Sequence, residues 1–264
     1  MSNEHKNFLR KTRINKFFIN CCRIGLLLGF LLAWELLAKY EIIDAFIFSS
    51  PSRMIAIIGK LYRENNLWVH IYASLYETVM GFIISTFAGT LIAIILWWNK
   101  TLRNILEPYV ITLNSLPKIA LGPIIIVWIG TGKTAIIFMA VLICIIITII
   151  SMLAGFINVD AEKIMLLKSM HATKFQIMQK LVLPANIPTL ISVLKINVGL
   201  SWIGSIMGEY ISSKEGLGYL LVYGSQIFQL DLVMASTVIL CVLAGSMYAI
   251  VALVEKIVHK RFNK

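Results

Sequence analysis

The sequence predicts an all-α integral membrane protein with six transmembrane helices. Hydrophobic residues make up 59% of the chain, its mean hydropathy is +0.84 and only 14% of its residues are charged, against about 25% in soluble proteins. The apolar residues are gathered into long runs, and a run of about 20 residues crosses the ~30 Å hydrocarbon core of a bilayer. The basic residues, which give a net charge of +11, stand mostly between these runs.

The first expected span covers residues 24–38 and follows a basic N-terminal segment, residues 1–23. A signal peptide has the same layout, but the bulky residues Trp34 to Leu37 stand where small residues would mark a cleavage site. We therefore expect an uncleaved helix and treat residues 24–264 as a single transmembrane domain. The sequence Ser49-Ser50-Pro51-Ser52 predicts a turn and the start of an amphipathic helix on the outer surface.

The remaining spans are expected at about 75–98, 105–129, 134–156, 189–211 and 232–254. The span at 105–129 contains Pro117 and Pro123, and it should be kinked or broken because proline lacks an amide hydrogen. The following GTGKT sequence is similar to the end of a phosphate-binding loop. The glycine that such a loop needs five positions before Gly132 is Val127, so we expect a tight outer turn instead.

A polar loop, residues 158–188, separates the fourth and fifth spans. Thr173 and Gln176 form a capping box at the start of a short helix, and Leu183-Pro184 is expected to end it. Its apolar residues recur at three- and four-residue spacing and predict one stripe: Phe175, Met178 and Val182. Such a helix is suited to docking on a partner, and the alternative is that it lies on the lipid surface.

The distribution of basic residues predicts the orientation of the spans. With both termini and the loop at 158–188 in the cytoplasm, sixteen basic residues lie inside and six outside. Only Lys118 and Lys195 fall within expected spans. This topology and the phospholipid headgroups account for the positive charge. No basic helix is interleaved with base-stacking aromatic residues, so we expect no nucleic-acid partner.

Three tracts of the sequence resemble parts of one protein family, and they occur in the same order as in that family. Residues 169–188 resemble the cytoplasmic loop of permease subunits of binding-protein-dependent ABC importers. Residues 106–130 and 195–220 resemble the third span, and the fifth span with its outer re-entrant turn, of the nitrate, sulfonate and taurine type. The loop keeps Leu-Val-Leu-Pro at 181–184.

The loop departs from the family pattern at its start. Met165-Leu166-Leu167 stand where the family has Glu-Ala-Ala, and His171 stands where it has glycine. Glycine at that position would join two short helices through a residue with positive φ. Because histidine adopts positive φ more readily than most residues, we expect the turn geometry to be kept.

The resemblance implies the type I ABC importer permease fold and a path for a small solute such as nitrate, a sulfonate or taurine. It implies a bacterial inner membrane location, a second permease copy in a homodimer, two cytoplasmic ABC ATPases and an extracytoplasmic substrate-binding protein. It assigns coupling to the ATPase to Ser169, His171, Ala172, Thr173, Phe175, Met178 and Pro184. It assigns the translocation path to Asn114, Pro117, Lys118, Ser201, Trp202 and Glu209.

The chain is not expected to be an enzyme, and any ATP hydrolysis must come from a separate subunit. Its four histidines stand in polar segments, and its four cysteines lack metal-ligand spacing, so we expect no metal and no cofactor. Two alternatives remain. An ion-coupled transporter or channel would ordinarily need paired ionisable residues in the membrane, and a membrane scaffold would transport nothing.

Lys118 is the charge that we expect deepest in a span. It stands 13 positions after Ile105, about 20 Å along a straight helix, too far for its ammonium to reach the interface. Either it bonds backbone carbonyls that Pro117 leaves free, which would hold the broken helix, or it meets a passing anion.

Overall fold

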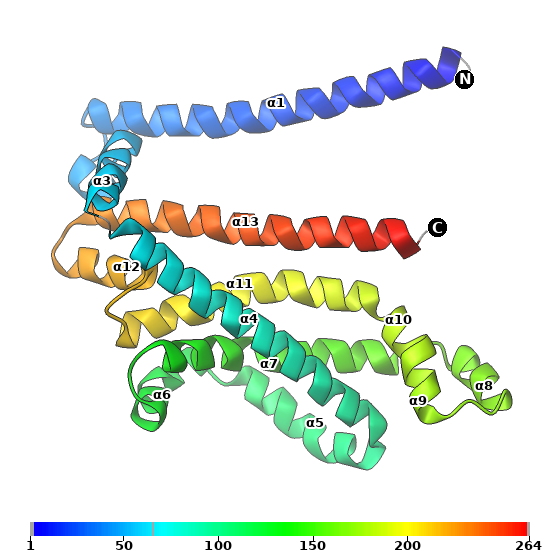
Figure 1. The fold of residues 1–264 in the computed structure, drawn as a ribbon. Helices are drawn as coiled ribbons and strands as arrows, with labels where there is room; N and C mark the ends of the chain where they lie inside the picture. The colour runs from blue at the N-terminus through cyan, green and yellow to red at the C-terminus, as the bar shows by residue number, and fades with distance from the viewer. Residues whose placement is uncertain (1–2, 65, 263–264) are drawn as a thin grey trace.

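The computed structural model describes residues 3–64 and 66–262, and its regular structure there is entirely helical (Figure 1). The prediction of an all-helical membrane fold is confirmed. Five helices are long and apolar enough to cross a membrane, and a bent pair could make a sixth. The helices are α1 (Asn3–Lys39), α2 (Ala45–Phe48), α3 (Pro51–Arg63), α4 (Leu67–Trp98), α5 (Lys100–Ser115), η1 (Lys118–Leu121), α6 (Gly122–Ile129), α7 (Lys133–Ile157), α8 (Ala161–Ser169), α9 (Lys174–Ile177), η2 (Met178–Val182), α10 (Leu183–Ala185), α11 (Ile187–Ser212), α12 (Leu217–Gln226) and α13 (Leu230–Phe262).

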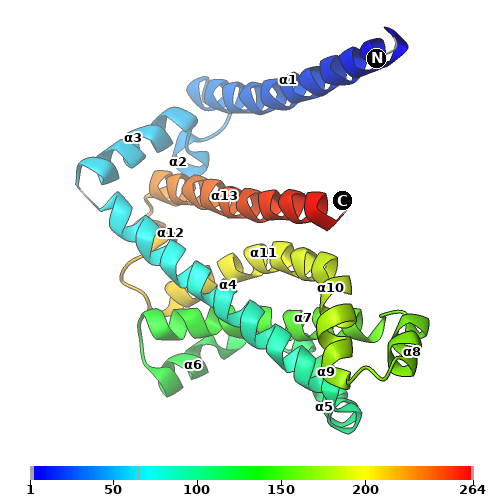
Figure 2. The ribbon, with the colours of Figure 1, turned by 45° about the vertical axis from the view of Figure 1, so that its right-hand side comes forward.

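The N-terminal part lies to one side of the molecule. Helix α1 packs on α2 and α3 and lies apart from α13 in both views (Figures 1 and 2). The predicted start of α3 is confirmed, with Ser50 capping the helix and Pro51 in its first turn. Arg53 of α3 forms an ion pair with Asp231 of α13 at 2.7 Å, so α3 is tied to the last membrane helix.

Helices α4, α7 and α11 form the packed core, and small residues bring their backbones together. A Cβ on Gly81 of α4 would lie 2.5 Å from the Cβ of Ala140 on α7. A Cβ on Gly204 of α11 would lie 2.5 Å from the Cα of the same alanine. Close helix packing of this kind, built on small residues, is typical of membrane proteins, where burial of apolar surface does not drive association.

Buried polar side chains also cross-link these three helices. The amide of Asn197 on α11 donates to Thr86 of α4 at 3.0 Å and to Thr148 of α7 at 2.8 Å. The hydroxyls of Thr78 and Ser205 lie 2.5 Å apart between α4 and α11. A hydrogen bond in an apolar interior costs more to break than one in water, so these contacts fix the relative register of the core helices.

The expected third span is broken, as predicted. Helix α5 and the segment η1–α6 meet at 87°, because Leu116 is extended and Pro117 cannot continue the hydrogen-bond ladder. The turn before α7 places Gly130 at φ 91° and Gly132 at φ 116°, values that favour glycine. The GTGKT sequence is thus a tight turn that leads into a long apolar helix.

The chain has two distinct ends. The short helices α8–α10 lie at the same end as both labelled termini, and α3, α6 and the start of α12 lie at the other end (Figures 1 and 2). We call them the loop end and the turn end. All long helices run between these two ends.

Candidate functional site: the loop end and the broken helix

The loop end begins with a turn that joins α8 to α9. His171 adopts φ 58°; its amide donates to the Lys168 carbonyl at 2.9 Å, and the Ala172 amide donates to the Leu167 carbonyl at 3.0 Å. These two bonds define a Schellman motif, which ordinarily places glycine at the position of His171. The prediction that His171 adopts positive φ in this turn is confirmed.

The predicted capping box is also confirmed. The hydroxyl of Thr173 accepts the amide hydrogen of Gln176 at 3.3 Å, and the Gln176 side chain accepts the amide hydrogen of Thr173 at 2.8 Å. Both bonds satisfy amides that a helix start leaves without partners. Ser169, another predicted coupling residue, is exposed and donates to the Leu166 carbonyl at 2.7 Å.

Pro184 does not end the short helix, and this expectation was wrong. The chain widens into the π turn η2, where the Leu183 amide bonds to the Met178 carbonyl, and it stays helical to Ala185. A widened turn changes which carbonyl faces the next amide, so the proline fits at the start of α10. The break comes at Asn186, whose side chain donates to the Val182 carbonyl at 2.9 Å.

The predicted single apolar stripe is divided between two environments. Met178 is 3% exposed and Val182 0%, and both pack into the chain's own core with Phe156. Phe175 is 62% exposed. The π turn rotates the later residues inward, so of these three only Phe175 can contact a partner in this arrangement. The role first expected of Met178, contact with the partner, does not fit its position.

Further exposed apolar residues lie on the same polar loop as Phe175. Met165, Leu166 and Met170 of α8 and its turn are 70%, 61% and 70% exposed. The ammonium of Lys174 lies 5.5 Å and 5.6 Å from the ring centres of Trp97 and Trp98, and it donates to the Trp98 carbonyl. We call Met165, Leu166, Met170 and Phe175 the loop-end apolar face. It rests on a unit that α4, α7 and α11 hold in place.

The residues predicted to line a path fall into two separate groups. Asn114, Pro117 and Lys118 lie together at the break between α5 and η1. The Lys118 ammonium donates to the Asn114 carbonyl at 3.2 Å and to the Asn114 side-chain oxygen at 3.5 Å. That carbonyl would bond the Lys118 amide in a continuous helix, so the ammonium replaces a bond that the break removes.

The second group lies inside the helix core on α11. Ser201, Trp202 and Glu209 are 0%, 6% and 1% exposed. The Ser201 hydroxyl donates to the Val198 carbonyl at 3.0 Å, and Trp202 packs against Met247 of α13. Within this chain, therefore, these three residues are surrounded by protein.

Two polar side chains of α4 contact the segment after Glu209, and a third lies beside Glu209 itself; none of the three was expected from the sequence. The Gly216 amide donates to His70 at 3.0 Å, the Leu217 amide to Ser74 at 2.7 Å, and Glu77 lies beside Glu209. Glu77 is an acidic residue within an expected span, and that signal could have identified it. The spacing of these three residues places them on one face of α4.

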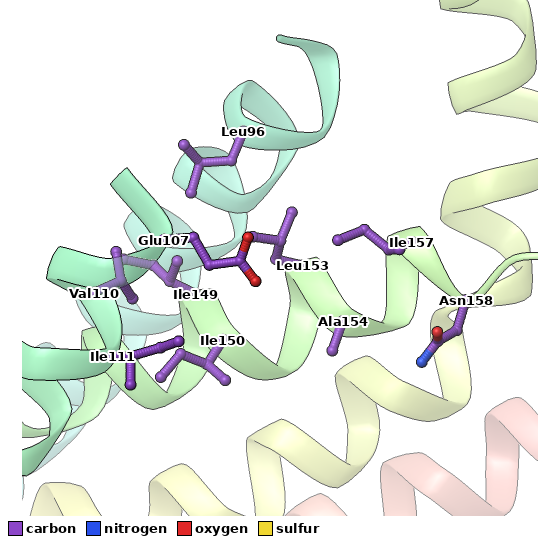
Figure 3. A pocket seen from close by; sticks show the side chains of 10 residues that line it. All are labelled: Leu96, Glu107, Val110, Ile111, Ile149, Ile150, Leu153, Ala154, Ile157 and Asn158. Carbon is purple, nitrogen blue, oxygen red and sulfur yellow. The ribbon is translucent and has the colours of Figure 1, made fainter. Parts of the chain in front are cut away.

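A cavity of about 280 Å³ opens between α4, α5 and α7 toward the loop end (Figure 3). Its lining is apolar apart from Glu107 and Asn158, and the Glu107 carboxylate extends between the side chains of α7 (Figure 3). The cavity lies beside α5, the helix that carries Asn114 before the break. This side of the core therefore combines the broken helix with open space.

Comparison with known proteins identifies the family. Residues 81–264 match the family described as binding-protein-dependent transport system inner membrane component. A probable ABC transporter permease protein of Haemophilus influenzae is 29% identical over 219 residues, which cover 83% of this chain and 88% of that protein. The taurine transport system permease protein of Escherichia coli is 25% identical over 226 residues, covering 84% and 82%.

The fold agrees with this assignment. The structure of a bacterial ABC transporter involved in the import of the acidic polysaccharide alginate has a chain that superposes with a TM-score of 0.64 at 16% identity, covering 91% of this chain and 98% of that one. The fold is the type I ABC importer permease fold, and the chain is a multi-pass membrane protein. Because the family match extends over most of its length, the chain belongs to the binding-protein-dependent transport system inner membrane components, permease subunits that work with separate ATPase subunits and a substrate-binding protein.

Proposed function

We propose that two copies of this chain form the path through which an ATP-driven importer carries a small anion of the sulfonate class into the cell. The loop-end apolar face is the feature that supports coupling to an ATPase. Its exposed side chains stand on a unit whose other side, Met178 and Val182, is buried in the core. An ATPase that grips this face would move α4, α7 and α11 with it.

The coupling unit is suited to transmit force because its own hydrogen bonds keep it rigid. The Schellman turn at His171 and the capping box at Thr173 fix α8 and α9 relative to each other. When the ATPase subunits close on ATP, the unit follows as a rigid body, and the membrane helices rock between inward- and outward-open states.

Substitution of Phe175 tests this mechanism. Phe175→Asp would place an unpaired carboxylate in the ATPase contact, which costs several kcal/mol, so we expect at least roughly tenfold weaker ATPase binding and a matching loss of ATP-driven uptake. Gln179→Asp adds the same charge at an exposed polar position of the same short helical unit and serves as the control. Copurification and uptake are measured in proteoliposomes. If both variants behave like the wild type, the loop does not dock the ATPase, and a helix lying on lipid would explain that result.

The broken helix is the proposed contact for the substrate. Lys118 has three donor hydrogens, and within the described chain it donates only to Asn114, so a donor remains for an anion. A contact between Lys118 and an anionic substrate is also supported by the similarity of the chain to the taurine transport system permease protein.

We expect Lys118→Met to lower uptake while ATP hydrolysis still responds to the loaded binding protein. Lys133→Met removes a cation from the turn end and is the matched control. A fall in thermal stability that accompanies the loss of uptake would assign Lys118 a structural role instead.

We also propose that the loop end faces the cytoplasm, with both termini, as the excess of basic residues there favours. In a chain without its four native cysteines, a cysteine at Lys174 should react with an impermeant thiol reagent only in opened cells. A cysteine at Lys214, at the turn end, should react in intact cells. The opposite pattern would reverse the orientation.

A further inference from the structure

Two carboxyl groups meet inside the helix core near the turn end. Glu77 of α4 and Glu209 of α11 are each 1% exposed, and their carboxyl groups lie within hydrogen-bonding reach of one another. One oxygen of each group, Glu77 Oε2 and Glu209 Oε1, has no donor among the described residues. The proposed coupling and substrate contacts use neither side chain.

Glu209 is the member of the pair whose surroundings favour a carboxylate. Its Oε2 accepts the Gly218 amide hydrogen at 2.6 Å, and α12 begins at Leu217, so its partner is the first turn of a helix. The N-terminus of a helix carries partial positive charge and stabilises an anion. The approach requires glycine, because a Cβ on Gly216 would lie 2.2 Å and a Cβ on Gly218 2.9 Å from the same oxygen.

Glu77 lacks such a partner. Lys133, a basic side chain at the turn end, forms an ion pair with Glu215 instead, and both of those side chains are about half exposed. Two carboxylates in contact would repel strongly where water is excluded, and neither has a hydrogen to donate. No set of three or more His, Cys, Asp or Glu side chains that could hold a metal occurs in the part of the chain described.

We propose that Glu77 and Glu209 bind one proton between them, with Glu77 as the neutral acid that donates to the carboxylate of Glu209. The bond ties α4, α11 and the start of α12 into one body at the turn end. Separating α4 from α11 there would leave a charge or a donor without a partner in an apolar interior. Rocking of the helices must therefore use another joint, such as the break between α5 and η1.

Infrared spectroscopy of the purified protein tests the proton directly. At neutral pH the wild type should show a carboxylic acid C=O band that shifts in D₂O, and Glu77→Gln should remove it. Glu255→Gln is the control, because Glu255 is ion-paired with Lys195 at 2.5 Å, and it should leave the band in place.

Stability supplies an independent measurement. The amide of Glu77→Gln can donate as the acid does, so its thermal midpoint should stay near that of the wild type. Glu77→Leu cannot donate and should lower the midpoint by about 5 °C. The proposal is overturned if the wild type lacks the band, or if Glu77→Gln lowers the thermal midpoint as much as Glu77→Leu. It is also overturned if removing Na⁺ and K⁺ lowers the midpoint of the wild type but not of the variants. That result would place a metal cation between the two carboxylates.

Discussion

The loop end and the turn end both connect membrane helices, but their backbone amides find hydrogen-bond acceptors in different parts of the chain. At the loop end, Thr173, Gln176 and the turn at His171 form bonds with residues at most five positions away. At the turn end, the amides of Gly216 and Leu217 depend on side chains of α4, more than 140 positions earlier. A unit that is satisfied locally can expose its apolar face to a partner, whereas the turn end is part of the core.

The dependence of the turn end on the helix core can be tested most directly at Gly218. A Cβ there would lie 2.9 Å from the Cβ and Oε2 of Glu209 and 3.0 Å from the Ile206 carbonyl. We expect Gly218→Ala to cost about 3 kcal/mol, because it both overpacks the site and breaks the carboxylate contact. Unfolding in detergent is the measurement. Gly199→Ala, where no atom lies within 4 Å, is the control and should not be destabilised.

A smaller effect is expected at the loop end. Thr173→Ala removes the hydroxyl acceptor of the capping box and should cost about 1 kcal/mol, with the loss confined to the loop. Hydrogen exchange should show faster opening of α9 while α4 and α11 keep their protection. Ser192→Ala, whose hydroxyl bonds within one exposed helical turn, is the control. Equal loss of protection in α4 would show that the loop end is not a local unit.

The smallest effect is expected at His171, where substitution by glycine should raise the stability of the protein instead of lowering it. His171→Gly relieves the strain of a side chain at φ 58°, partly offset by the greater freedom of glycine in the unfolded chain. We expect a gain of about 0.5 kcal/mol with unchanged uptake. His171→Val, which is β-branched, should be destabilised, and a neutral result for valine would mean that the turn can adopt another conformation.

Some features followed from neighbouring residues alone. The capping box of Thr173 and Gln176 and the break at Pro117 could be predicted because each depends on groups a few positions apart. The end of the short helix could not, because Pro184 fits only after the π turn that begins at Met178. Packing against Phe156, from another helix, decided which side of that turn faces inward.

The bundle of apolar helices and its polar loop could be predicted from the sequence, since hydropathy and local capping act over one run or one turn. The contact of Glu77 with Glu209 and the bond from the turn before α12 to Ser74 could not be predicted in this way. Those pairs come from helices far apart in the chain. Their contact depends on how closely Gly81 and Gly204 let α4 and α11 approach α7, and no local pattern encodes that distance.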